Sequence, residues 1–398
     1  MPPRSAQRLL FLIADTGGGH RASATAVSRQ LADAHPGEYE IRIVDPFAES
    51  APRLLARTAG LYAPITQRMR WLWGGLYYAT NSRAAVSVLR RSALRLVEPG
   101  IARLVRTWKP AALVSFHPLL NHSAARVAAQ VQPRVPVVTV ITDLVDVHAA
   151  WACRDVDAVV TPSPGGFERC RRAGIPADRC HQAGPAVGEA FRRPPPKLAE
   201  RAALRQHLGL DPKAFIVLVC GGADGSGDIP RRARALAAAP LDLQLAVICG
   251  RNARAREELE GLRDHRGNRV AVLGFADDMA DWMRVSDVVV TKAGPGTIAE
   301  ALCCGVPLLL SWYLPGQERG NVEWVVDIGA GRYVPHVEQL VDAVAELSMP
   351  GSQSLAAMRR AVRKAARPDA TREIADIIAG VASRDALAPL AAAGGSAC

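Results

Sequence analysis

Two short segments of the sequence carry residues whose types and spacing suit chemistry on a phosphorylated substrate. The first, TKAGPGTIAEAL at residues 291–302, follows a β-branched run. Gly294 and Gly296 allow a sharp turn, after which the N–H groups at a helix start would converge on an anion. We predict a phosphate site there, with Thr297 as the N-cap or first residue of the helix. A capping box between Thr297 and Glu300 is the alternative, and it needs no ligand.

The second segment is DTGGGHR at residues 15–21, which places His20 at the end of a glycine loop. A histidine with a pKa near neutrality is a natural general base, so we expect His20 to deprotonate a substrate hydroxyl. A structural histidine near a helix N-terminus is the alternative. The loop lacks the GxGxxG spacing, and a dinucleotide is therefore not indicated.

Alternating apolar runs and helical stretches must hold these loops in place. Each run is rich in Val, Ile and Leu and ends in a glycine or a polar residue, as buried parallel strands do. Such runs lie at residues 9–14, 113–116, 137–141, 158–160, 215–220, 243–249, 270–273, 287–290 and 307–311. Because ligands gather at the carboxyl ends of parallel strands, the pattern predicts an α/β fold with two doubly wound, Rossmann-like halves facing a central cleft.

A proline segment separates the two halves. The three successive prolines of RRPPPK, residues 192–197, can continue neither a helix nor a central strand. We therefore assign residues 1–190 to an N-terminal domain, 191–200 to a linker and 201–366 to a C-terminal domain. Residues 367–398 are expected to form a helix followed by a disordered Ala/Gly tail.

Composition narrows the class of protein. Apolar residues make up 49% of the chain, yet no apolar run has the length that crosses a bilayer. The first apolar run, residues 8–14, is too short for the core of a signal peptide. The eight cysteines show no CxxC pair and no metal-ligand spacing. We therefore expect a cytoplasmic protein with no bound metal.

Positive charge is concentrated in residues 50–109, which hold eleven Lys or Arg against one acid, Glu98. Aromatic residues are interleaved with these cations, namely Tyr62, Trp71, Trp73, Tyr77, Tyr78 and Trp108. Cations and amphipathic rings together suit an anionic membrane surface. The same chemistry would suit nucleic acid, and solvated helix faces around a few core aromatics are the simplest alternative. We favour the membrane surface and expect no nucleic-acid partner.

Several motifs taken together resemble one enzyme family. They are DTGGGHRASA at residues 15–24, Thr142-Asp143-Leu144 with His148 and Trp151, CGRN at 249–252, the run at 291–301, and GQE with GN at 316–321. Together they resemble the diacylglycerol glycosyltransferases, which comprise the plant and bacterial monogalactosyldiacylglycerol synthases and the bacterial processive diacylglycerol glucosyltransferases. These enzymes are related to the peptidoglycan lipid-linked N-acetylglucosaminyltransferase.

The resemblance implies a GT-B fold, with the acceptor on the first domain and a UDP-sugar mostly on the second. It implies inverting transfer of a hexose from a UDP-hexose to diacylglycerol without metal or cofactor, with His20 as the base. The protein would sit peripherally on the inner, cytoplasmic face of the membrane. The residues implied for the acceptor are Gly18, Gly19, His148 and Trp151. For the donor they are Gly296 and Thr297 at the diphosphate, Glu300 at the ribose, Gln317 and Glu318 at the sugar hydroxyls, Asn321 supporting that loop, Gly222 and Arg251 beside the nucleotide, and Gly274 and Phe275 near the uracil.

Two other functions fit parts of the same pattern. The donor chemistry can serve another lipid-linked or soluble acceptor, or the chain can be a UDP-sugar-sensing binding protein without activity. The presence of His20 and of Gln317 with Glu318 favours an enzyme, since a sensor need not keep a base.

Overall fold

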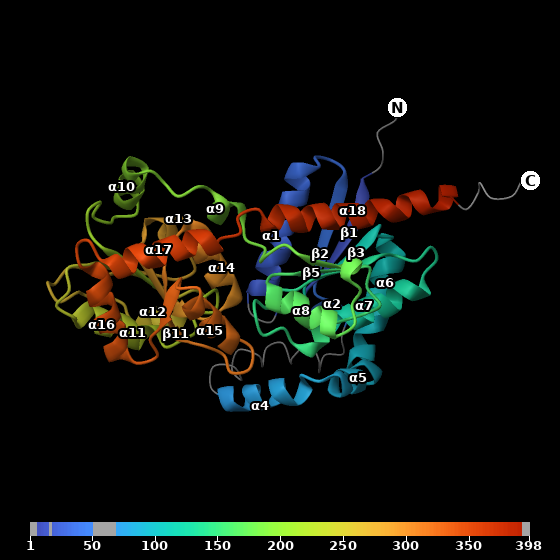
Figure 1. The fold of residues 1–398 in the computed structure, drawn as a ribbon, viewed down its shortest axis with the longest axis horizontal. Helices are drawn as coiled ribbons and strands as arrows, with labels where there is room; N and C mark the ends of the chain where they lie inside the picture. The colour runs from blue at the N-terminus through green and yellow to red at the C-terminus, as the bar shows by residue number, and fades with distance from the viewer. Residues whose placement is uncertain (1–5, 16–17, 51–68, 392–398) are drawn as a thin grey trace, which may run out of the picture. The chain divides into compact units, whose positions relative to one another are not determined.

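The computed structural model describes residues 6–15, 18–50 and 69–391. Contacts divide the chain into two units, of which the first is Met1–Gly188 with Asp369–Cys398 and the second is Glu189–Pro368 (Figure 1). Each unit holds one six-stranded sheet in which every pairing of neighbouring strands is parallel. Parallel strands require crossover connections, and helices supply them in both units. The predicted α/β class with two doubly wound halves is thereby confirmed.

The sheet of the first unit has the strand order β2-β1-β3-β4-β5-β6. Its strands are β1 (Gln7–Leu12), β2 (Tyr39–Val44), β3 (Ala112–Ser115), β4 (Val137–Val140), β5 (Ala158–Thr161) and β6 (Cys180–Gln182). Its helices are α1 (Gly19–Ala34), α2 (Pro46–Ser50), α4 (Arg70–Thr80), α5 (Arg83–Arg91), α6 (Glu98–Trp108), α7 (Pro118–Gln130), α8 (Pro164–Arg172) and α18 (Ala370–Ala391), with 3₁₀ turns at Ala93–Val97, Ala149–Trp151 and Ala177–Arg179. Successive residues of β1 enter different cores, with Leu9 and Phe11 on one face and Leu10 and Leu12 on the other. Burial of both faces explains why these strands read as continuous apolar runs.

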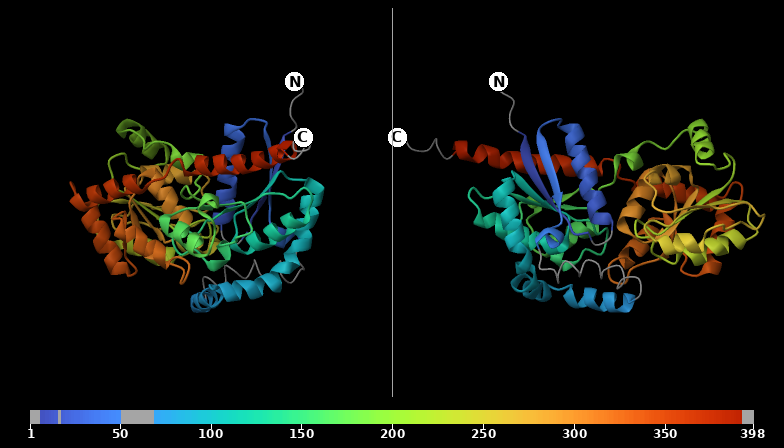
Figure 2. Two further views of the ribbon diagram at one scale, coloured as in Figure 1. Left: turned by 45° about the vertical axis from the view of Figure 1, so that its right-hand side comes forward. Right: turned by 180° about the vertical axis from the view of Figure 1, so that it is seen from behind.

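The last helix, α18, completes the first unit rather than standing alone after the second. Ile374 and Ile378 are fully buried in the core that β1 shares with α1. At the start of α18, the Thr371 hydroxyl accepts from the Val187 N–H at 3.0 Å and donates to the Val187 carbonyl at 2.9 Å. Figure 2 shows α18 running beside α1 in both views. The helix predicted within residues 367–398 therefore belongs structurally to the N-terminal domain, and residues 392–398 lie outside the described part of the chain.

The sheet of the second unit has the strand order β12-β11-β10-β7-β8-β9. Its strands are β7 (Ile216–Cys220), β8 (Gln244–Ile248), β9 (Ala271–Leu273), β10 (Val288–Lys292), β11 (Leu308–Trp312) and β12 (Gly331–Tyr333). Its helices are α9 (Glu189–Arg192), α10 (Leu198–His207), α11 (Ile229–Ala238), α12 (Ala253–Glu258), α13 (Met279–Val285), α14 (Pro295–Cys304), α15 (Arg319–Asp327), α16 (Val337–Ser348) and α17 (Gln353–Ala365). The three prolines of the predicted linker fall between α9 and α10, where the Pro194 carbonyl accepts from Arg284 at 2.6 Å, and the ends of the linker, residues 191–200, overlap both helices.

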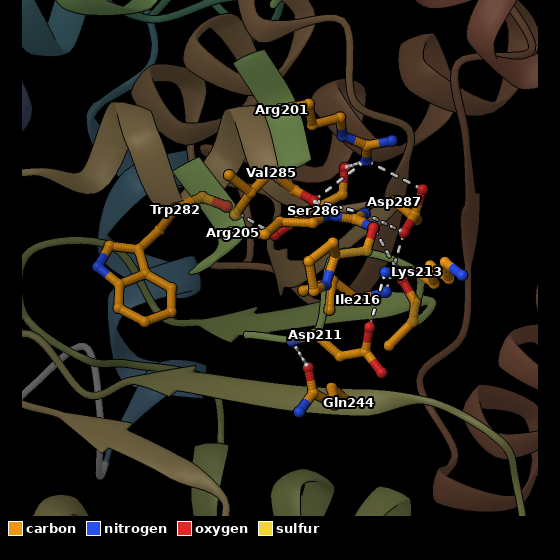
Figure 3. A network of polar contacts seen from close by, with 12 residues as sticks. Arg201, Arg205, Asp211, Lys213, Ile216, Gln244, Trp282, Val285, Ser286 and Asp287 are labelled. Atoms are coloured by element: carbon orange, nitrogen blue, oxygen red, sulfur yellow. Dashed lines mark hydrogen bonds and ion pairs between the residues drawn. The ribbon is translucent and has the colours of Figure 1, made fainter. Parts of the chain in front are cut away.

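A buried carboxylate, Asp287, clamps the amino end of β10. Figure 3 shows Arg201 and Arg205 from α10 converging on it, at 3.0 and 2.8 Å. Arg359 from α17 bonds the same carboxylate at 2.6 Å, and the Ile216 N–H donates to it at 2.9 Å. Burial alone would raise the pKa of Asp287, but the Arg201 charge, the Ile216 N–H and Arg205 together hold it below its usual value. The clamp fixes the strand whose other end carries the predicted phosphate turn.

Candidate active site

The strand, glycine turn and helix predicted at residues 287–302 are present, and the helix begins earlier than expected. Helix α14 starts at Pro295 with Gly294 as its N-cap, and the first helical bond runs from the Ile298 N–H to the Gly294 carbonyl at 3.0 Å. The expectation that Thr297 is the N-cap is therefore wrong, because proline suits the first helical position. No side chain caps this helix, so the capping box of Thr297 with Glu300 does not form.

This early start leaves two backbone donors for a ligand. Pro295 has no N–H, and the N–H groups of Gly296 and Thr297 have no partner within the described part of the chain. Space beside Gly296 is open, since a Cβ atom built there would have no neighbour within 4 Å. Two unpaired N–H groups at the positive end of a helix are suited to binding an anion.

A β-bulge and the side chain of Asn321 stabilise the turn between β10 and α14. Residues Thr291 and Lys292 pair with Leu310 and Trp312, so β11 carries one extra residue at this point. Asn321 is buried, and its amide donates to the Ala293 carbonyl at 2.9 Å. Bulges re-aim side chains at the ends of strands, and here the bulge coincides with the last residue of β10.

A glycine loop after β7 lies beside the phosphate turn. Gly222 has a φ of +68°, and a Cβ atom built there would lie 3.7 Å from Thr297 Oγ1. Gly225 has a packing role, since its Cβ atom would fall 2.0 Å from the Cys249 carbonyl oxygen. The loop after β8 locks onto this glycine loop, because the Arg251 N–H donates to the Ala223 carbonyl at 2.8 Å. Gly222 and Thr297, predicted from distant segments, are thus brought together.

An exposed aromatic ring marks the end of β9. Phe275 follows Gly274 and is 56% exposed, and the Arg251 guanidinium carbon lies 5.8 Å from the centre of its ring. The same guanidinium bonds Asp224 at 2.8 Å, an ion pair that sequence reasoning did not anticipate. A flat exposed ring beside a cation suits stacking on a planar base. Gly274 accepts from the Gly250 N–H at 3.1 Å, which joins the two loops.

The QE pair before α15 is more constrained than the resemblance implied. Glu318 is 3% exposed, with one carboxylate oxygen paired to the Lys292 ammonium and the other accepting from the Leu314 N–H at 2.9 Å. Glu318 is therefore engaged on both oxygens by its own domain, while Gln317 is half-buried. Sequence reasoning overlooked Lys292, although a cation at the end of a strand and directly before a glycine turn was the available signal.

Glu300 lies one turn into α14, and the pKa of its carboxyl group is raised. Glu300 is half-buried, and no hydrogen bond to its carboxyl group contributes to its pKa among the described residues. Burial raises the pKa of Glu300 from 4.5 to about 8. A desolvated carboxyl group is available for hydroxyl groups of a ligand.

In the first unit, His20 sits at the second residue of α1. Its Nδ1 lies 2.9 Å from the Thr142 hydroxyl, and its ring meets the His117 ring edge-on with centroids 4.8 Å apart. Burial lowers the pKa of His20 to about 4, against the opposing effects of the Phe116 carbonyl and the Asp15 charge. The imidazole is therefore neutral at pH 7, which is the form that can accept a proton.

The residues predicted to bind the acceptor differ in their exposure to solvent. Gly18 is the N-cap of α1, and Gly19 is exposed with open space beside it. Trp151 is fully buried, and its indole N–H donates to Asp143 at 2.7 Å. His148 is also buried, with Nδ1 accepting from the Ala150 N–H at 3.1 Å. Trp151 lies beside His20, with ring centroids 6.3 Å apart. The expectation that Trp151 and His148 face an acceptor stays a prediction.

Helix α4 presents apolar side chains to solvent. Trp71 is 73% exposed and Tyr78 is 62% exposed, and Leu76 lies exposed beside them. The inward side of α4 is anchored by Tyr77, whose hydroxyl donates to the Asp146 carbonyl at 2.9 Å, and by Thr80, whose hydroxyl lies 3.2 Å from His148 Nε2. The exposed helix is thus fastened to the segment that carries His148 and Trp151.

Residues 50–109, the basic window, also contain aromatic residues that do not face solvent or that lie outside the described part of the chain. Trp108 packs inward, with the Arg8 guanidinium carbon 5.0 Å from its ring centre. Tyr62 and the rest of residues 51–68 lie outside the described part of the chain. Among the described residues, no helix combines the length and the apolar character needed to cross a bilayer. Within the same described ranges, no three His, Cys, Asp or Glu residues group as a metal site would require.

Comparison with known proteins identifies the family to which the chain belongs. Residues 20–187 match the profile of monogalactosyldiacylglycerol (MGDG) synthase, and residues 216–374 match that of the glycosyltransferase family 28 C-terminal domain. The chain is 32% identical to the chloroplastic monogalactosyldiacylglycerol synthase of Spinacia oleracea, covering 94% of this chain and 72% of that protein. It is 33% identical to monogalactosyldiacylglycerol synthase 1 of Arabidopsis thaliana, covering 92% and 70%.

A solved structure supports the architecture. The crystal structure of Acinetobacter baumannii MurG matches with a TM-score of 0.62 at 18% identity, covering 94% of this chain and 99% of that one. At this identity the likeness concerns the fold, and it agrees with the two parallel sheets described above. The chain therefore belongs to the monogalactosyldiacylglycerol synthase family and is a glycosyltransferase with the GT-B fold.

Proposed function

We propose that this protein is an inverting glycosyltransferase that moves a hexose from a UDP-hexose to diacylglycerol. The observation that carries the donor half of the proposal is the pair of N–H groups at Gly296 and Thr297, beside Gly222, which have no partner among the residues that the structure describes. Phe275 offers a stacking surface for the uracil, and Glu300 an acceptor for ribose hydroxyls. The names of the curated relatives support diacylglycerol as the acceptor.

The proposed reaction is a single displacement. The acceptor hydroxyl attacks the anomeric carbon and gives its proton to neutral His20, while the bond from that carbon to the UDP oxygen breaks. Negative charge grows on the departing diphosphate, where fixed N–H dipoles at the start of α14 stabilise it. A positioned base contributes about 10²- to 10⁴-fold to such a rate. No metal or cofactor is part of the proposal.

The acceptor is a lipid, so the protein must meet a membrane surface. Trp71, Leu76 and Tyr78 on α4 supply rings and apolar side chains that suit the headgroup boundary. Arg91 at the end of α5 and Arg95 in the 3₁₀ turn that follows are exposed and suit anionic headgroups. We therefore propose peripheral docking through the described part of the basic window, on the cytoplasmic face.

The test is a donor-resolved transfer assay. The full chain is incubated with anionic vesicles that contain diacylglycerol and with UDP-glucose, UDP-galactose or UDP-glucuronate in turn. UDP and glycolipid are measured in the same samples. The expected result is glycolipid from one preferred donor. UDP binding without glycolipid from any of the three would favour another acceptor or a sensing role.

A further inference from the structure

Lys292 is the last residue of the strand that leads into the phosphate turn, and the proposed function gives it no role. Its ammonium would lie 2.9 Å from a Cβ atom built on Gly294, and its Cε 3.8 Å from one built on Gly222. Thr297 Oγ1 would lie 3.7 Å from that same Gly222 position. The lysine stem and the helix start therefore border one space beside Gly222.

The partner of Lys292 in this structure is a buried carboxylate. The side chain of Lys292 is 21% exposed and that of Glu318 is 4% exposed, and the two are joined through one Glu318 oxygen. The other oxygen stays fixed by the Leu314 N–H. Glu318 can therefore lose its lysine without losing its position in the loop.

The geometry points to Lys292 as a catalytic residue that exchanges partners during the reaction. Lys292 leaves Glu318 and contacts the diphosphate of the bound donor, and the released Glu318 oxygen accepts a hydroxyl of the transferred sugar. This inference rests on the proposed function and adds to it a residue and an order of events. It also explains how Glu318 can serve the sugar although both of its oxygens are engaged in the free protein.

Charge decides the direction of the exchange. A diphosphate carries more negative charge than one carboxylate, and an ammonium at a low-dielectric site follows the greater charge. Charge on the diphosphate increases as its bond to the sugar breaks, so the contact with Lys292 strengthens in the transition state. Lys292 should accordingly affect the turnover number as well as donor affinity.

The experiment compares UDP and UMP binding by calorimetry in the full chain, for the wild type, Lys292→Met and Glu318→Gln. We expect Lys292→Met to weaken UDP binding roughly 10- to 100-fold, the range for one charge-assisted contact, and to weaken UMP binding far less. We expect Glu318→Gln to tighten UDP binding, because no carboxylate competes for the ammonium, while its turnover number falls. Lys213→Met, an exposed lysine at the opposite end of the sheet, is the matched control and should bind UDP normally.

The outcomes separate this inference from the proposed function. Normal UDP binding by the wild type together with unchanged affinity in Lys292→Met would overturn the role of Lys292 alone. Weaker UDP binding in Glu318→Gln would overturn the exchange, because it would show that the ion pair only supports the fold of the loop. No UDP binding by the wild type would overturn both the inference and the donor half of the proposed function.

Discussion

At the scale of single residues, His20 shows how surroundings set reactivity. The ring is desolvated, touches a second histidine and bonds the Thr142 hydroxyl, and burial brings its pKa to about 4. A low pKa keeps the imidazole neutral across the physiological range, so that proton acceptance needs no prior deprotonation. A low pKa also makes His20 a weaker base. The reaction can proceed with a weak base because the UDP leaving group is stabilised separately.

We predict that His20→Ala lowers transfer about 10²- to 10⁴-fold, because the base is lost, while UDP affinity is unchanged. In the wild type at saturating donor, kcat/KM for the acceptor should stay level from pH 7 down to about 5. It should fall as pH drops through about 4, where His20 takes up a proton. His265→Ala, an exposed histidine, is the control. Turnover of His20→Ala near the wild-type rate would show that His20 is not the base.

At the scale of elements, the site depends on how β10 is held at both ends. Its carboxyl end carries Lys292 and the turn into α14, and its amino end is preceded by Asp287 in the arginine clamp. A parallel strand fixed at one end transmits its position to the other, so the clamp positions the phosphate turn without touching a ligand. Breaking a buried ion pair by removing one partner leaves uncompensated charge.

We predict that Asp287→Ala lowers the free energy of unfolding by about 3–5 kcal/mol, measured by urea denaturation. Asp242→Ala, whose carboxylate is almost fully exposed in its pair with Arg266, should cost less than about 1 kcal/mol. The folded-state pKa of Asp287 is lowered, so its contribution is present above the unfolded pKa and is lost as pH falls through the folded value. The stability gap between wild type and Asp287→Ala should therefore narrow in acid, and a gap that widens there would contradict the clamp.

Element placement was predictable where patterns are strong. The long apolar runs predicted the central strands of both sheets and the edge strand β9, whereas the edge strands β2, β6 and β12 are absent from the predicted runs. Strands β6 and β12 have only three residues each, and β2 carries polar residues between its apolar ones, so none of them forms a continuous apolar run. The sequence predicts that α14 starts at Thr297, because threonine favours the N-cap, whereas in the structure the helix already starts at Pro295. The Lys292–Glu318 pair was not foreseeable, since it joins residues 26 positions apart through side-chain geometry.

At the scale of the whole molecule, the positively charged part of the sequence coincides with an exposed surface on α4. The net charge of +11 is gathered mainly in residues 50–109, and the described part of that window exposes rings and apolar side chains on α4. The sequence predicted such a surface but could not tell which aromatics face outward. Trp71 and Tyr78 do, whereas Tyr77 and Trp108 pack inward.

We predict that the double variant Trp71→Ser/Tyr78→Ser weakens binding to anionic vesicles roughly tenfold or more, because two rings no longer enter the headgroup region. Co-sedimentation with vesicles measures this directly. Leu198→Ser, which alters an exposed apolar residue of the second unit, is the control and should bind as the wild type does. Equal vesicle binding by the double variant and the wild type would remove α4 from the docking surface.

The most direct test of the central claim is the ratio of glycolipid formed to UDP released on diacylglycerol vesicles. Transfer through an acceptor hydroxyl consumes one donor for each glycolipid, so the account predicts a ratio near one with the preferred UDP-hexose and loss of both products in His20→Ala. UDP released without glycolipid would identify hydrolysis or a different acceptor, and it would contradict the claim that this protein transfers a hexose to diacylglycerol.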